Sequence, residues 1–227
     1  MVETRKKITG VVAFLVFCAA LFSIARTCRD TSDRQLADAE TALRRVGAEE
    51  TVNLLGENSR VVFLTIKDVG GKQRESLEQW REILEKSRVE VQAVETIDPA
   101  DYRMADFELM SAGIPGDWVI QQLETHADAD AVISLLGPPS FSEEHFEMVP
   151  DTRPKMILLS TIDTPYMLVP FFEEDIIQLA LVARMVGFRD DKPAKGNYQE
   201  IFDQYFQIVT TETWQDVLLQ EGFGEEF

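Results

Sequence analysis

The chain contains few cysteines and histidines, and this scarcity argues against metal and disulfide chemistry. Only two of its 227 residues are cysteine and two are histidine. Cys18 lies inside an apolar run, so a disulfide with Cys28 is not expected, and no metal-ligand spacing surrounds His126 or His145. Both histidines are expected at partly exposed surface positions. The sequence therefore predicts neither a metal site nor a disulfide framework.

Basic residues are also scarce. The chain has 22 lysines and arginines against 40 aspartates and glutamates, which gives a formal net charge of −18. A field of this sign repels nucleic-acid backbones and anionic lipid headgroups. We therefore expect no nucleic-acid partner, and we interpret the acidity as a source of solubility.

The sequence lacks the familiar catalytic motifs. There is no GxGxxG, and the stretch DVGGKQ (68–73) lacks the earlier glycine and the Ser/Thr of a phosphate-binding loop. No GxSxG nucleophile turn occurs, and the adjacent acid pairs Glu143/Glu144 and Glu173/Glu174 do not suit a two-carboxylate site. The sequence predicts no enzymatic activity and no cofactor.

An uncharged N-terminal run, residues 8–25, follows the basic residues Arg5, Lys6 and Lys7. The run is long enough to cross a bilayer core. It predicts a membrane anchor with the rest of the chain outside the cytoplasm, on the periplasmic side. The alternative is a signal peptide cleaved near Ala25, where small residues gather, which would release a secreted protein.

From residue 60 onward, apolar strand patterns alternate with helical patterns. Strands are expected at 61–66, 89–95, 131–136, 156–160 and 166–172, and helices at 72–87, 116–127 and 173–186. A further helix, a strand at 206–209 and a final helix follow a linker. This alternation predicts a three-layer α/β/α sandwich around a mainly parallel sheet of five to six strands, in the flavodoxin-like order 2-1-3-4-5.

The predicted organisation has four parts. Residues 1–30 are the anchor or signal, and residues 220–227 are a flexible tail. Residues 31–59 are a polar helical stalk, or an N-terminal helix packed on the domain, divided at Gly47. Residues 60–219 form a single α/β domain, long enough for one core.

Polar residues follow the predicted strands where each strand ends. Ligands of doubly wound sheets bind outside the carboxyl ends of the strands. The candidate binding residues, from the first strand's end to the fourth's, are Lys67, Asp68, Asp98, Ser140, Thr161 and Asp163. The competing interpretation is that these residues serve turns and helix caps alone.

Three segments carry a resemblance to a known family: WVIQQLETHADADAVISLLGPPS (118–140), KMILLSTIDTP (155–165) and, more weakly, FQIVTTETWQDVL (206–218). The first two resemble the N-terminal lobe of type I periplasmic substrate-binding proteins, the sugar-binding and repressor-like family, and the third resembles the Val-Thr-x-x-Asn run near the C-termini of those proteins. The resemblance implies that Asp163 and Ser140 contact a ligand, with Lys67 and Asp68 in the first loop. Two departures stand out: only one lobe is present, and Thr213 stands where the family has asparagine.

These observations predict a membrane-anchored, extracytoplasmic, single-lobe module that binds or senses a small polar, sugar-like ligand. A second chain, a protein partner or another copy, would then supply the other side of the ligand pocket. The alternative is a non-catalytic scaffold that docks protein partners at the cell envelope.

Overall fold

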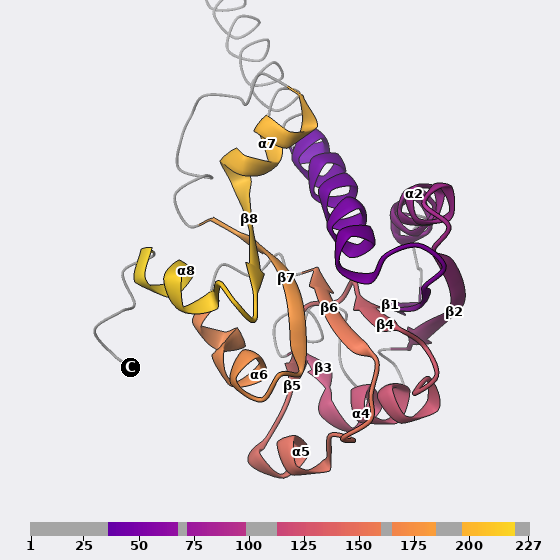
Figure 1. Ribbon diagram of the computed structural model, residues 1–227, viewed down its shortest axis with the longest axis vertical. Helices are drawn as coiled ribbons and strands as arrows, with labels where there is room; N and C mark the ends of the chain where they lie inside the picture. The colour runs from indigo at the N-terminus through magenta and orange to yellow at the C-terminus, as the bar shows by residue number, and fades with distance from the viewer. Residues whose placement is uncertain (1–35, 68–71, 99–112, 160–164, 185–196, 221–227) are drawn as a thin grey trace, which may run out of the picture. The chain divides into compact units, whose positions relative to one another are not determined.

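The computed structural model describes residues 36–67, 72–98, 113–159, 165–184 and 197–220 (Figure 1). The chain divides into two compact units, Met1–Glu40 and Thr41–Phe227, and the fold described below is that of the second. The predicted anchor at residues 8–25 lies outside the described residues. Within the described ranges, no helix has the length and apolar character needed to cross a membrane.

The centre of the fold is a six-stranded sheet in the order β2-β1-β4-β6-β7-β8. The first five of these strands run parallel, and the last is antiparallel to its neighbour. Their bounds are β1 Arg60–Ile66, β2 Glu90–Ile97, β4 Ala131–Ser134, β6 Lys155–Leu159, β7 Ile177–Ala183 and β8 Phe206–Thr210. Counted along the chain, the first five strands of this sheet have the predicted order 2-1-3-4-5, so that prediction is confirmed.

Both faces of the sheet are covered, because its inner strands are apolar on both sides. In β1, Val61 and Phe63 belong to one buried cluster, while Val62 and Leu64 belong to the other. A strand of a parallel sheet that is covered by helices on both faces has this continuously apolar pattern. The predicted three-layer arrangement is confirmed.

Different helices cover the two faces (Figure 1). On one face lie the helix that ends at residue 55 and α2 (Lys72–Lys86), which contributes the buried Trp80 and Leu84. The opposite cluster takes side chains from α4 (Gly116–Thr125), η2 (Pro165–Leu168), α6 (Val169–Glu173) and α8 (Trp214–Gln220). The remaining elements are β3 (Ile114–Pro115) paired with β5 (Pro139–Ser140), α5 (Glu143–Met148) and α7 (Tyr198–Tyr205).

The fifth strand and the helix after it were predicted in the wrong order. Residues 165–173, expected to be largely strand, form η2 and α6, and the strand β7 lies inside the expected helix 173–186. Pro170 falls in the first turn of α6, where a missing N–H costs nothing. Asp175, expected in a first helical turn, lies in the turn before β7 with a φ of 49°.

Gly47 does not divide the N-terminal helix, as the sequence had suggested. Residues 36–55 form one continuous helix. Within the second unit, its residues Leu43, Val46 and Ala48 are buried. The glycine allows a close approach between two elements and does not end a helix.

Two strands each carry one extra residue, a glutamine. The register of β1 with β2 skips Gln92, and that of β6 with β7 skips Gln178. The side-chain oxygen of Gln178 accepts a hydrogen bond from the Met156 amide at 2.7 Å, so the bulge leaves that amide satisfied. Gln92 lies on the sheet edge, where a bulge disfavours pairing with a further strand.

Candidate binding site at the carboxyl ends of the strands

The position of β1 marks the point where the strand order of the sheet reverses. β1 lies between β2 and β4. The connection from β1 to β2 passes through α2 on one face, whereas the connection that leads into β4 passes through α4 on the other. Where the strand order reverses in this way, the loops at the carboxyl ends diverge and leave a crevice. The candidate site is therefore the region beyond Ile66 and Ser134.

Two of the predicted residues meet at this edge. Lys67 directly follows β1, and its amide donates to the Ile97 carbonyl at 2.9 Å. Its Nζ lies 2.6 Å from Oδ2 of Asp98, the residue after β2. The side chains are 66% and 30% exposed, so the ion pair faces solvent. The pair brings an ammonium group and a carboxylate group together at this edge of the sheet.

The end of β4 contributes Ser134, a residue that the sequence interpretation did not select. Its hydroxyl is buried, donates to the Gly137 carbonyl at 3.1 Å and accepts from the Leu136 amide at 3.3 Å. Gly137 has a φ of 90°, which disfavours other residue types. The available sequence signal was a serine inside the apolar run 131–136, three residues before Gly137.

Ser140 lies in β5, beside the start of α4. Its side chain is exposed. A Cβ built on Gly116 would lie 2.8 Å from the Ser140 carbonyl oxygen and 3.0 Å from the His145 ring. The short β3–β5 sheet is thus held tightly against the first turn of α4, which fixes Ser140 relative to that helix.

The other predicted site residues lie outside the described residues. These are Asp68, Thr161 and Asp163. Ligand contact by any of the six residues stays a prediction. In the part of the chain that the structure describes, no group of three His, Cys, Asp or Glu side chains is placed to hold a metal ion.

A serine, a histidine and an aspartate line up near Ser140, but their contacts serve a helix cap. Nδ1 of His145 accepts from the Ser142 amide at 2.9 Å and lies 2.9 Å from the Ser142 hydroxyl. Its proton therefore sits on Nε2, which is 3.1 Å from Oδ1 of Asp117. Because a backbone N–H already occupies Nδ1, the imidazole is poorly placed to act as a base toward the hydroxyl.

The prediction that His126 is partly exposed was wrong. His126 is buried, and its Nε2 lies 3.0 Å from Oε1 of Glu95 on β2. It follows α4 directly, and its amide donates to the Gln122 carbonyl at 3.0 Å. His145, with 22% of its side chain exposed, is partly exposed as predicted.

Comparison with known proteins gives similarity at the level of chain fold only. No protein-family model and no curated protein matches the sequence. Among solved structures, a solute-binding protein of an ABC transporter from Burkholderia graminis, in complex with D-arabinose, is 14% identical with a TM-score of 0.47. The alignment covers 77% of this chain and 60% of that one.

Two further structures are similar to a comparable degree. A periplasmic ribose ABC transporter protein from Conexibacter woesei is 13% identical, with a TM-score of 0.48, over 79% of this chain and 60% of that one. A sugar-binding protein of a sugar ABC transporter from Bacillus halodurans is 16% identical, with a TM-score of 0.46, over 78% and 64%. The chain spans about 60% of the length of the Burkholderia graminis protein and of the Conexibacter woesei protein. All three are described as transporter or binding proteins and none as an enzyme, but TM-scores below 0.5 carry no functional argument.

Proposed function

We propose that the domain is a single-lobe, solute-binding-like module that binds or senses a small polar ligand in the crevice between the carboxyl ends of β1 and β4. We further propose that residues 8–25 tether it to a membrane, with the domain outside the cytoplasm. The observation that carries the proposal is the switch in strand order at β1, with connections over opposite faces of the sheet.

The chemistry of the crevice supports a ligand rich in hydroxyl groups. The Lys67 ammonium is a hydrogen-bond donor, and it is paired with the Asp98 carboxylate at 2.6 Å. The Asp98 carboxylate accepts hydrogen bonds only. Sugars carry hydroxyls that both donate and accept, so a donor–acceptor pair of this kind suits them. The opposite side of the ligand would be covered by a second chain, because a single lobe encloses one side of a ligand only.

Isothermal titration calorimetry of the full-length chain with pentoses, hexoses, free amino acids and nucleosides tests this proposal. We expect saturable binding of one class, and we expect Asp98→Asn to weaken it roughly tenfold, since a hydrogen bond to a charged group contributes about 1.5–3 kcal/mol. No binding in any class by the wild type would contradict the proposal.

The matched control is Glu57→Gln. Glu57 also accepts from a cation, Arg88, at 3.2 Å, and 64% of its side chain is exposed. It precedes β1, whereas the candidate site lies beyond the other end of that strand. The two variants remove the same charge, so an equal loss of ligand affinity in both would indicate a general charge effect and not a site at Asp98.

One observation favours the scaffold alternative. Tyr166 and Met167 in η2 are 43% and 48% exposed, and Leu219 in α8 is 61% exposed. η2 and α8 contact one another, so these side chains belong to neighbouring elements. Exposed apolar side chains that gather in this way mark interaction surfaces. If the domain is a scaffold, Leu219→Lys abolishes assembly in light scattering, and no small ligand binds the wild type.

A further inference from the structure

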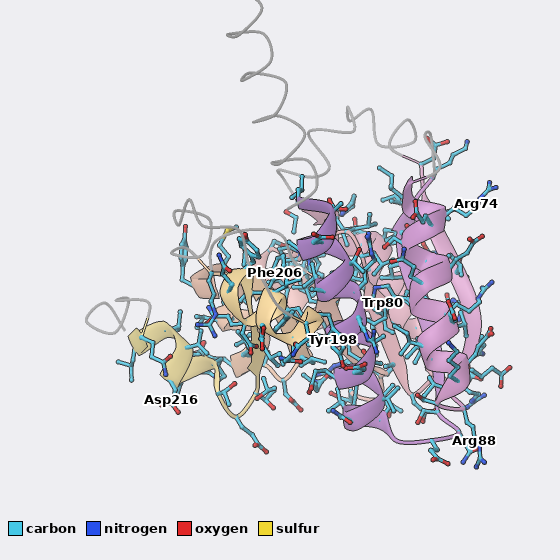
Figure 2. The ribbon with its side chains drawn as sticks, turned by 90° about the horizontal axis from the view of Figure 1, so that it is seen from above. Arg74, Trp80, Arg88, Tyr198, Phe206 and Asp216 are labelled. Atoms are coloured by element: carbon cyan, nitrogen blue, oxygen red, sulfur yellow. The ribbon has the colours of Figure 1, made fainter. Side chains whose placement is uncertain are left out.

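A groove lies away from the strand ends, between the helix of residues 41–55 and α2. The two helices lie side by side, with Trp80 buried in the layer they form (Figure 2). The groove between them has a volume of about 460 Å³, within the usual range for small-molecule sites. Charged side chains on both walls, Arg45 and Glu49 on one and Glu82 and Lys86 on the other, line it.

Arg45 is held in place on two sides. Its guanidinium carbon lies 3.9 Å from the centroid of the Tyr198 ring, at the start of α7. Its Nε lies 3.3 Å from Oε1 of Glu49, one turn along the same helix. The Tyr198 hydroxyl donates to both oxygens of that carboxylate, at 3.3 and 3.2 Å. These three side chains form a closed set of contacts that fixes the plane of the guanidinium.

The outer end of this guanidinium is available for a ligand. Its contacts with Glu49 and Tyr198 engage Nε and the flat face, and within the described ranges neither Nη nitrogen has a hydrogen-bond partner. The side chain is 53% exposed. Two parallel N–H groups in a fixed plane match the two oxygens of a carboxylate or a phosphate, and their fixed orientation lowers the entropy lost on binding.

Lys86 supplies a second cation on the opposite wall. Its Nζ lies 2.7 Å from Oε1 of Glu82, which leaves two of its three ammonium hydrogens for other acceptors. Both glutamates of the groove are thus already bonded to a cation of the same groove. Three cations, Arg44, Arg45 and Lys86, line the groove against these two carboxylates, so the groove suits an anion although the whole chain carries a net charge of −18.

We propose that this groove binds a small oxyanion ligand, with a carboxylate or phosphate group held in a bidentate manner by the two Nη nitrogens of Arg45. Tyr198 and Glu49 position Arg45, and Lys86 contacts the same anion or a second acidic group of the ligand. The groove is independent of the candidate site at Asp98, and a ligand there is not required for binding here.

Calorimetry of the full-length chain tests the proposal, with inorganic phosphate and succinate as separate probes and chloride as the background anion. We expect saturable binding of at least one probe. Arg45→Lys should weaken it roughly tenfold or more, because lysine keeps the charge but lacks the planar fork. Tyr198→Phe, which keeps the ring and removes the hydroxyl that orients Glu49, should weaken it by a smaller factor.

The matched control is Arg81→Lys on the outer surface of α2. Arg81 makes the same type of contact, from Nε to Glu85 four residues later, at 3.8 Å, and its side chain is 45% exposed. This variant should leave the affinity unchanged. Phosphate binding alone would identify a phosphorylated ligand, and succinate binding alone a carboxylate; both results support the proposal. The proposal is overturned if neither probe binds, or if Arg45→Lys binds the probe as tightly as the wild type.

Near-identical circular dichroism of the variants verifies folding. Loss of binding in Tyr198→Phe provides a second test if Arg45→Lys does not fold.

Discussion

Gly47 lies directly against the indole ring of Trp80. A Cβ built on Gly47 would lie 2.8 Å from both Cζ2 and Cη2 of that ring. Trp80 is fully buried and packs edge-on against Phe63 of β1, with ring centroids 5.9 Å apart. The glycine therefore lets the N-terminal helix approach α2 and the sheet closely.

Gly47→Ala is expected to destabilise the fold by up to about 2 kcal/mol. Alanine is favoured over glycine inside a helix by about 1 kcal/mol, but forcing a methyl group into a packed core costs about 1–3 kcal/mol. In a Trp80→Phe background, where the smaller ring leaves room, the same change should stabilise. Urea unfolding of the four proteins of this double-mutant cycle measures both effects. A stabilising Gly47→Ala in the presence of Trp80 would show that the ring moves aside without cost.

Gln178→Ala is expected to lower the free energy of unfolding by about 1–2 kcal/mol, because it leaves the partly buried Met156 amide without its 2.7 Å acceptor. Gln92→Ala, the same change at the exposed bulge of β2, should cost less than about 0.5 kcal/mol. Thermal and urea unfolding compare the two variants. An equal decrease in the free energy of unfolding in both variants would mean that the bulges themselves, and not the contact with the Met156 amide, determine the effect.

Two exposed carboxyl groups should titrate at a lower pH than usual. A hydrogen bond from Gln92, together with the charge of Arg60, lowers the pKa of Asp128 although desolvation opposes the shift. The hydrogen bond and charge of Lys86 lower the pKa of Glu82. Because both folded-state pKa values lie below those of the unfolded chain, these groups stabilise the fold above their ordinary pKa values. That contribution is lost as the pH falls through the folded-state values.

Carboxyl-carbon NMR titration of two variants tests these assignments, each variant serving as the control for the other. Gln92→Ala should raise the pKa of Asp128 alone, and Lys86→Ala should raise the pKa of Glu82 alone. A rise of both in either variant would indicate a change in the overall field of the protein and not the loss of a local contact.

The sequence predicted the strands that are bounded by clear turns and the order in which they lie. The runs at 61–66, 131–136 and 156–160 are apolar and short, and turn residues follow them, so only a buried strand fits. At residues 166–186 the structure has helix and then strand, the reverse of the predicted order, and this difference has a physical reason. A strand covered on both faces, such as β7, is as apolar all round as a buried helix, and periodicity does not separate the two.

The candidate site was only partly predictable. The positions of Lys67 and Asp98 followed from the rule that parallel strands end at one edge. Their 2.6 Å contact depends on side-chain geometry that the sequence does not contain. Ser134 was missed because a buried serine inside an apolar run looks like part of the strand. The groove at Arg45 was also not predicted, because its lining residues come from two helices and its key contact comes from Tyr198, which is 153 positions further along the chain.

The most direct test of the central claim is amide NMR of the isotope-labelled full-length chain during titration with pentoses and hexoses. The account predicts that one sugar shifts the resonances of Lys67, Asp98 and Leu136, at the ends of β1, β2 and β4, and leaves those of Arg45 and Glu57 unchanged. If no sugar shifts the three strand-end resonances, or if the shifts fall elsewhere on the domain, the crevice at the strand order switch is not a sugar-binding site.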